Sequence, residues 1–154
     1  MTFCLSFDSP VGRLAVRADD ETVVEVRFDG VCAADAPSSA LCERTRDELT
    51  VYLAGRRRDF TVPVTPHGTS FQRAVWQAMC EIPYGETRTY GDLAAAVGEV
   101  DAAQAVGLAC GANPIPLIIP CHRVVAANGL GGFGGGLDRK RWLLELERGQ
   151  TRLC

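Results

Sequence analysis

The sequence changes its pattern once, and this change restricts the fold more than any other feature. Residues 3–29 contain three runs of β-branched or alternating apolar residues separated by turn signals, which is typical of strands. In the second half the apolar residues recur at helical spacing instead. Between the halves, Pro66 and Gly68 would break any regular element. The chain is therefore predicted to be α+β, with a domain at 1–64, a linker at 65–68 and a second domain at 69–154.

The first domain is predicted to contain one helix and a last strand after its three initial strands. The segment 38–55, "SSALCERTRDELTVYLAG", has Ser38 or Ser39 as its N-cap and Gly55 just past its end. The segment 58–64, "RDFTVPV", is predicted to be a short strand.

The second domain is predicted to be mainly helical. Helices are expected at 69–83, at 90–98 with Thr89 as the cap, from about Asp101 to 111, and from a cap at Asp138 to a stop at Gly149. The two middle helices, joined by a tight turn with glycine, have the spacing of a helix-turn-helix. The second of them is nearly bare of large side chains, which suits either close packing in a core or close approach to a DNA groove.

Composition excludes several classes of protein. The hydrophobic fraction of 47% is too high for a disordered chain, and no apolar stretch reaches the length of a membrane span. The start of the chain lacks the features of a signal peptide, so we expect a cytoplasmic protein with no membrane contact. The seven cysteines are odd in number and form no C-x-x-C pair, which predicts reduced thiols. A net charge of −3 predicts that any DNA affinity is moderate and salt-sensitive.

A cysteine and a histidine follow a short apolar run that two prolines bracket. Cys121 and His122 stand directly after residues 116–120, "PLIIP". This rigid, buried segment suits a reactive thiol, but it also suits an inert core cysteine. Glu147 falls on or beside the apolar stripe of the last helix, where a carboxylate needs a partner, and the chain has only two histidines. One hypothesis is that Cys121 is a nucleophile, His122 its proton acceptor and Glu147 the group that orients the imidazole. Neighbouring residues of a strand point to opposite sides, so a Cys–His contact would need a bend or a bridging water.

Several of these segments together resemble the alkylguanine-DNA alkyltransferase family. The similarity rests on "IPCHRVV", "FQRAVWQAMCEIPYGETRTYGDLA", "NPIP" and "GGGLDRKRWLLELE", and it runs without large gaps from about residue 69 to 149. The segment "DSPVGRL" near the start also fits. The proline–cysteine–histidine–arginine–valine core is highly specific in this setting, and it favours the reactive thiol over the inert one.

The resemblance implies a fold and an activity. The first half would be a ribonuclease-H-like α/β domain, and the second a mainly helical domain with a winged helix-turn-helix. The protein would act as a monomer on double-stranded DNA that carries alkylated guanine, and it would flip the damaged base out of the stack. A single, irreversible transfer would move the alkyl group from O6-methylguanine, and from O4-methylthymine, to Cys121. The family needs no cofactor for this reaction.

The resemblance also implies roles for particular residues. His122 would activate Cys121 through a water, and Glu147 would hold His122. Tyr90 would crowd the phosphate behind the target nucleotide and donate its hydroxyl toward the base. Asn113 would brace the turn before the active-site strand, although an ordinary Asn-Pro turn explains it nearly as well, and Arg123 would more readily be a structural ion-pair donor than a chemical participant. The full DNA-binding or base-binding set is Tyr90, Ala102, Ala103, Gln104, Cys110, Asn113, Pro116, Arg123, Val124, Phe133 and Gly134.

Two positions depart from the family pattern, and the zinc ligands of some members are not matched. Gln104 stands where the family has an arginine that fills the space left by the flipped base, which predicts weaker flipping or weaker DNA affinity. Cys110 stands where a larger apolar residue often lines the base pocket. The cysteines and histidine of the first half do not match the zinc ligands of some members, so no metal is expected; these are Cys4, Cys32, Cys42 and His67.

Two other functions stay open beside alkyl transfer. One is a lesion-binding protein without transfer, although such relatives replace the cysteine that this chain keeps. The other is a thiol acceptor that no longer acts on duplex DNA, which the glutamine at Gln104 and the acidic net charge would suit.

Overall fold

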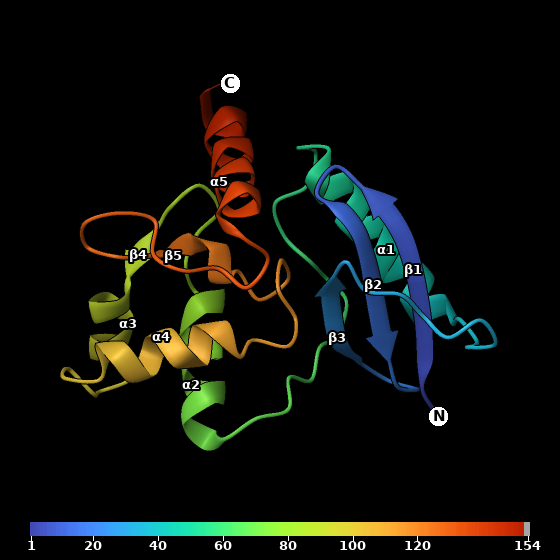
Figure 1. Ribbon diagram of the computed structural model, residues 1–154, viewed down its shortest axis with the longest axis horizontal. Coiled ribbons are helices and arrows are strands. Elements are labelled where there is room, and N and C mark those ends of the chain that lie inside the picture. Colours follow the sequence, from blue (N-terminus) through green and yellow to red (C-terminus); the bar gives the residue numbers. More distant parts are fainter. Residues whose placement is uncertain (153–154) are drawn as a thin grey trace. The chain divides into compact units, whose positions relative to one another are not determined.

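The structure is divided where the sequence changes its pattern. In the computed structural model, which describes residues 1–152, internal contacts group Met1–His67 into one unit and the chain from Gly68 into another (Figure 1). The amide of Thr65 still donates to the carbonyl of Val23, at 2.9 Å, so this part of the predicted linker is bonded to the first unit. The predicted limits of the two domains and of the linker stay predictions.

The first unit is built on a three-stranded antiparallel sheet. Its strands are β1 (Phe3–Ser9), β2 (Gly12–Ala18) and β3 (Val23–Phe28), in the order β1-β2-β3. Because β2 pairs on both sides, its side chains form the centre of the core, and Leu14 and Val16 are fully buried. Val16 lies opposite both Leu5 of β1 and Val26 of β3.

One helix, α1 (Ala40–Leu53), lies along a face of this sheet (Figure 1). Ser39 is its N-cap, as predicted, because the side chain accepts a hydrogen bond from the amide of Cys42 at 3.2 Å. Leu49 and Tyr52 are fully buried. Gly55, with φ of 77°, stands just past the helix in the left-handed conformation that glycine adopts without strain.

The predicted strand at 58–64 is wrong. Only Val64 forms an isolated bridge, to Val23, while the rest of the segment has no regular structure. Two features prevent a regular ladder of hydrogen bonds between this segment and a neighbouring strand. Pro63 has no N–H to donate, and the amide of Thr61 donates instead to the carboxylate of Glu48 in α1, at 2.8 Å.

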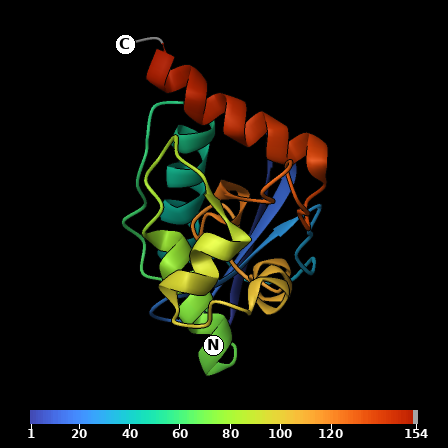
Figure 2. The same cartoon turned by 90° about the vertical axis from the view of Figure 1, so that its left-hand side faces the viewer.

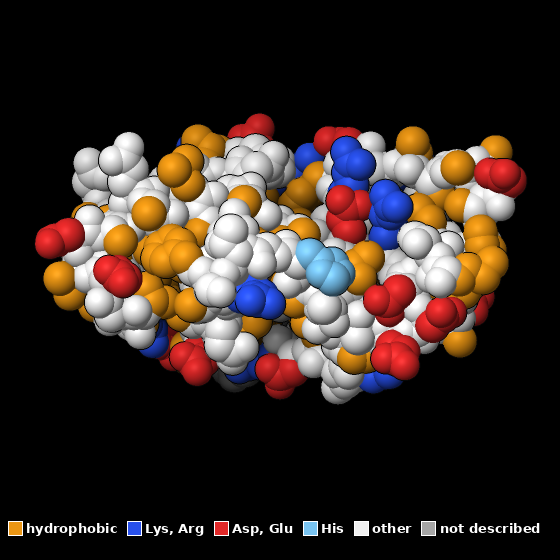
Figure 3. All heavy atoms as spheres, turned by 90° about the horizontal axis from the view of Figure 1, so that it is seen from below, with side chains coloured by type: hydrophobic (Ala, Val, Ile, Leu, Met, Phe, Trp, Pro, Cys, Tyr) orange, Lys and Arg blue, Asp and Glu red, His pale blue; other side chains and the backbone are white. Residues whose placement is uncertain are grey.

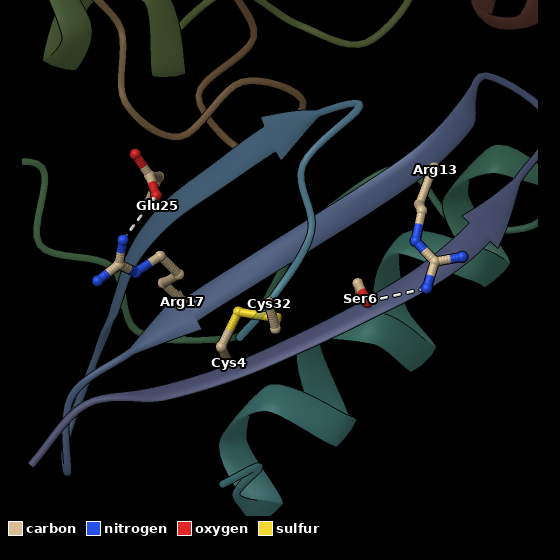
Figure 4. The surroundings of a disulfide bond; sticks show 6 residues. All are labelled: Cys4, Ser6, Arg13, Arg17, Glu25 and Cys32. Carbon is tan, nitrogen blue, oxygen red and sulfur yellow. Dashed lines mark hydrogen bonds and ion pairs between the residues drawn. A yellow bond between two sulfur atoms is a disulfide. The ribbon is translucent and has the colours of Figure 1, made fainter. Parts of the chain in front are cut away.

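The prediction that the cysteines are reduced is also wrong for two of them. Cys4 of β1 and Cys32 form a disulfide, with their Cα atoms 5.8 Å apart (Figure 4). The amide of Cys4 donates to the carbonyl of Pro37, which holds the segment between β3 and α1 against the edge of the sheet. Sequence spacing does not reveal such a pairing, because 28 positions separate the two residues.

The second unit is mainly helical. It contains α2 (Ser70–Cys80), α3 (Tyr90–Ala96), α4 (Ala103–Gly111) and α5 (Leu137–Arg152), and a parallel pair of two-residue strands, β4 (Arg88–Thr89) and β5 (Val124–Val125). The helices α2, α3 and α4 pack on one another, and the indole of Trp76 donates to the carbonyl of Ala109 at 2.8 Å between α2 and α4. Figure 2 shows α5 as one unbroken helix.

The helix ends follow the predicted capping residue at α3 and depart from the predictions at α4 and α5, while α2 begins after a cap at Thr69 that was not predicted. Thr69 and Thr89 each form a capping box with the residue three positions later. Helix α4 begins after Ala102, which contributes no side-chain cap, and not at Asp101. Helix α5 begins before Asp138, which lies in its first turn, and it continues through Gly149. None of the described helices is long and apolar enough to cross a membrane.

The segment before the candidate nucleophile is a turn. Leu117 is buried with φ of 76°, and the amide of Ile119 donates back to the carbonyl of Ile115 at 2.9 Å. A short 3-10 turn, Cys121–Arg123, follows, and β5 comes only after it. The chain thus bends at the cysteine, as a Cys–His arrangement requires.

Candidate active site

Cys121 is held at the end of a loop that Asn113 closes. The side-chain amide of Asn113 donates to the carbonyl of Ile119 at 2.9 Å, and its oxygen accepts from the amide of Ile115, also at 2.9 Å. One side chain therefore bonds both ends of the turn that carries the cysteine. This is more than an isolated Asn-Pro turn would provide, and it agrees with a bracing role for Asn113.

The thiol of Cys121 is protonated at rest. The residue is only 9% exposed, and burial raises the pKa of the thiol to about 11, although the side chain of Asn113 and the ammonium of Lys140 both lower it. A thiolate is the stronger nucleophile, so Cys121 must lose its proton during a reaction.

Glu147 is the centre of a buried hydrogen-bond network. Its carboxylate is 1% exposed and accepts hydrogen bonds on both oxygens. Oε1 accepts from the amide of Gly85 at 3.0 Å and from Nε of Arg123 at 2.9 Å. Oε2 accepts from Nε2 of His122 at 2.7 Å and from Nη2 of Arg123 at 3.0 Å. The network joins the loop before β4, the 3-10 turn and α5.

These contacts set the charges of the pair. Burial alone would raise the pKa of Glu147, but the bonds and charges of His122 and Arg123 outweigh it and lower that pKa to about 2. Burial lowers the pKa of His122 more than the contact with Glu147 raises it, so the ring is neutral at pH 7. An ionised carboxylate can only accept, hence Nε2 carries the ring proton and Nδ1 is the basic nitrogen.

Arg123 is a structural partner in this network. Its third donor group, Nη1, bonds to the carbonyl of Ile82 at 2.8 Å, and its guanidinium lies 5.6 Å from the ring centre of Tyr84. These donors are directed into the protein and the residue is 7% exposed, which suits the structural ion-pair role, while the membership of Arg123 in the DNA-binding set stays a prediction.

A cavity of about 130 Å³ opens onto Cys121. Most of its wall comes from small residues, so the backbone lies close to the enclosed space. The lining residues are Tyr90, Gly107, Cys110, Gly111, Cys121, Gly132, Phe133 and Gly134.

The glycine-rich loop at 129–136 is held against Tyr90. The amide of Gly132 donates to the tyrosine oxygen at 3.2 Å. Gly131 has φ of 72°, and a Cβ there would lie 2.5 Å from the same oxygen, so only glycine fits this position. The loop therefore needs glycine for contact with Tyr90, and not for a phosphate-binding turn.

Lys140 holds the other side of the same loop. Its ammonium is buried on α5 and donates to the carbonyl of Val124 at 2.6 Å and to that of Gly132 at 3.0 Å. Burial lowers the pKa of Lys140, while the nearby thiols of Cys121 and Cys110 raise it. Lys140 thus holds the loop in place by hydrogen bonds and also puts a positive charge near the nucleophile.

Both halves of the chain match models of a single protein family. Residues 70–149 match the DNA binding domain of 6-O-methylguanine DNA methyltransferase, and residues 3–66 match its ribonuclease-like domain. The chain belongs to the 6-O-methylguanine DNA methyltransferase family. The α+β fold with these two kinds of domain, predicted from the sequence, is confirmed.

Individual relatives agree over nearly the whole length. A methylated-DNA–protein-cysteine methyltransferase of Methanosarcina acetivorans is 45% identical over 148 residues, which cover 92% of this chain and 95% of the relative. The crystal structure of the Mycobacterium tuberculosis O6-methylguanine methyltransferase superposes with a TM-score of 0.89 at 42% identity, covering 97% of this chain and 94% of the other. A structure of the M. tuberculosis protein in complex with DNA gives the same TM-score and identity, with 96% and 94% covered.

Most of the predicted site residues lie close together in the structure. Their roles in the reaction stay predictions. His122 and Glu147 are in direct contact beside Cys121. Tyr90, Cys110, Phe133 and Gly134 line the cavity. Pro116 is buried within the turn before the cysteine, and Val124 offers a carbonyl that already accepts from Lys140. Ala102, Ala103 and Gln104 lie at the start of α4 and are not among the residues of the cavity wall; Gln104 is exposed.

Two features of the site were not predicted. Lys140 could have been found from its spacing, because Lys140, Leu143, Leu144 and Glu147 recur at helical intervals on the buried face of α5. The bond from the Gly85 amide to Glu147 has no signal in the sequence, since the two residues are 62 positions apart.

Among the described residues, no group of three or more His, Cys, Asp and Glu is arranged to hold a metal ion.

Proposed function

We propose that this protein repairs O6-methylguanine in double-stranded DNA by moving the methyl group to Cys121, once per protein molecule. One observation carries the assignment: a neutral histidine, oriented by a buried carboxylate, adjoins a buried thiol that opens onto a cavity. O4-methylthymine, monomeric action and a cytoplasmic location belong to the same proposal.

The proposed reaction is a direct displacement. The sulfur of Cys121 attacks the methyl carbon, the S–C bond forms and the C–O6 bond of the guanine breaks. The thiol proton passes through a bridging water to Nδ1 of His122, and the resulting imidazolium is stabilised by the ionised Glu147. The departing guanine takes up a proton that the hydroxyl of Tyr90 can donate.

The high pKa of Cys121 makes the thiol selective. A thiol with a pKa of about 11 is almost entirely protonated at pH 7, so it reacts poorly with electrophiles that meet it in solution. Proton removal by His122, the next residue in the chain, and attack on the methyl group then occur together once the damaged nucleobase is bound. Arg123 and Lys140 act as positioning residues in this scheme, because one fixes Glu147 and the other fixes the glycine-rich loop.

We place the DNA against α4, whose first turn is exposed and nearly free of bulk. Ala103 and Gln104 are exposed there, and Leu108, one turn further on, is 74% exposed on the same side as Gln104. A leucine on this face can make apolar contact in a minor groove. On the face drawn in Figure 3, acidic and basic side chains are interspersed, and with a net charge of −3 this fits moderate, salt-sensitive affinity.

The test is a stoichiometric assay on a duplex that contains one O6-methylguanine. Nucleoside analysis should show guanine restored up to one equivalent of protein and no further. Cys121→Ser should bind the same duplex and restore none, whereas the exposed Cys80→Ser should behave as the unaltered protein does. Turnover beyond one equivalent, or repair by Cys121→Ser, would contradict the proposal.

A further inference from the structure

Two thiols line the cavity, and the proposed repair reaction uses only one of them. Cys121 comes from the 3-10 turn and Cys110 from α4. The neighbours of Cys110 on the α4 wall, Gly107 and Gly111, have no side chains, so its sulfur is the only reactive group that α4 presents among the described lining residues. Both cysteines line the same cavity of about 130 Å³.

Cys110 lines the cavity and is held only weakly by its contact outside it. Its thiol donates only a weak contact, to the sulfur of Met79 at 3.7 Å, and the residue is half-buried. Burial, followed by the nearby Cys121, raises the pKa of Cys110 to about 12.

The other described cysteines offer no such pairing. Cys4 and Cys32 are joined to each other, Cys42 is buried in the first unit, and Cys80 is exposed at the end of α2. None of them lines this cavity.

We propose that Cys110 is a second acceptor, which closes a two-carbon bridge to Cys121 when the transferred group is a 2-haloethyl chain. This inference rests on the proposed function, because Cys121 must accept the chain first. Its substrates would be guanines whose O6 substituent carries a leaving group at the far carbon.

The bridge forms in steps whose atoms balance. Cys121 takes the haloethyl group, the C–O6 bond breaks and the guanine is released, as in methyl transfer. The new thioether sulfur then displaces the halide from the far carbon, which gives a three-membered episulfonium ring and a free halide ion. The sulfur of Cys110 attacks a ring carbon, the C–S bond of the ring opens and the thiol proton leaves to solvent. The product is a bis-thioether, and no oxidant or reductant is needed.

Proximity favours Cys110 over water as the nucleophile. A group held in the same small cavity has a high effective concentration, and sulfur is a much better nucleophile toward carbon than water is. Because Cys110 is protonated at pH 7, its share of the product should rise as the pH rises toward 9. The bridge would also remove an electrophile that could otherwise attack the bound DNA.

The experiment uses two duplexes, one with O6-methylguanine and one with O6-(2-chloroethyl)guanine. The second duplex is freshly prepared, because the chloroethyl group can cyclise onto the guanine ring on standing. After reaction, remaining thiols are capped with iodoacetamide and the protein is digested with trypsin. Cys110 and Cys121 lie on one tryptic peptide, residues 89–123, so a bridge appears as a peptide that has lost the halide and gains no cap. Cys110→Ser and the control Cys80→Ser are scored only on molecules that have accepted the group.

The expected result is methyl on Cys121 with Cys110 capped for the first duplex, and a bridged peptide for the second. Cys80→Ser should give the bridge, and Cys110→Ser should give a hydroxyethyl group on Cys121. A chloroethyl or hydroxyethyl chain on Cys121 with Cys110 capped, or a covalent protein–DNA product, would overturn the bridge and leave the proposed function intact. Absence of any adduct on Cys121 from either duplex would overturn the proposed function itself.

Discussion

Replacing Glu147 with glutamine should damage both the stability of the second unit and its chemistry. The substitution preserves the shape of the side chain, but it removes the negative charge that Arg123 and His122 share. The glutamine side chain also brings an N–H donor to a position whose neighbours are all donors, so two donors would face each other. Arg123 would then be a buried cation without a counter-ion, which is costly in a protein interior.

The magnitude follows from the pKa of Glu147. A fall from 4.5 to about 2 on folding corresponds to about 3 kcal/mol of stability at neutral pH. This agrees with the roughly 3–5 kcal/mol that is lost when one partner of a buried ion pair is removed. Because the folded pKa is the lower one, the contribution is complete above about pH 4.5 and disappears as the pH falls through about 2.

The assay is urea unfolding of the full chain at several pH values, with Glu145→Gln as the matched control. Glu145 is exposed on the same helix, so its substitution should change stability by no more than about 0.5 kcal/mol. The difference between Glu147→Gln and the unaltered protein should be about 3 kcal/mol at pH 7 and should shrink below about pH 4.5. A difference that matches the Glu145 control at pH 7, or that does not depend on pH, would refute the reasoning.

Transfer rates test the chemical half of the same prediction. Glu147→Gln and His122→Ala should each slow methyl transfer, and the double variant should be far less impaired than the two effects combined, as for groups that act as a unit. Additive effects would mean that Glu147 contributes only to folding.

Three other predictions concern parts of the chain outside this network. Gln104→Arg should tighten duplex binding and raise its salt dependence by up to about one unit of log–log slope, with no change in the rate on free O6-methylguanine base; unchanged or slower duplex transfer would contradict it. Reduction of the Cys4–Cys32 disulfide should destabilise the first sheet by about 3 kcal/mol, as measured by hydrogen exchange of the full chain, and equal protection in both states would count against the bond. Lys140→Met should speed amide exchange at 129–136 and slow transfer, whereas unaltered exchange would show that the lysine does not fasten the loop.

Local chemistry explains which elements could be predicted from the sequence. Ser39 and Thr89 were recognisable as helix caps because each bonds an amide only three positions away. The strand expected at 58–64 fails for the opposite reason. Its alternating residues suit a strand, but the missing donor of Pro63 and the distant carboxylate of Glu48 decide its conformation.

The same distinction holds at the candidate site. Helical spacing placed Glu147 on a buried face, and the scarcity of histidines pointed to His122 as its partner. The turn at Leu117, with its positive φ, was not predictable, since leucine rarely adopts that conformation and only the packed surroundings impose it. The resemblance had placed Cys110 in the base pocket, and the structure places it in the wall of the cavity that also holds Cys121.

The most direct measurement is to locate the methyl group after reaction with a duplex that carries O6-methylguanine. Intact mass should show one methyl group gained per protein, and peptide mapping should place it on Cys121 alone among the seven cysteines. Only this thiol has a neutral histidine, oriented by a buried carboxylate, beside it within the described chain. Methyl groups spread over Cys42, Cys80 or Cys110, or no gain in mass at all, would contradict the assignment of Cys121 as the acceptor.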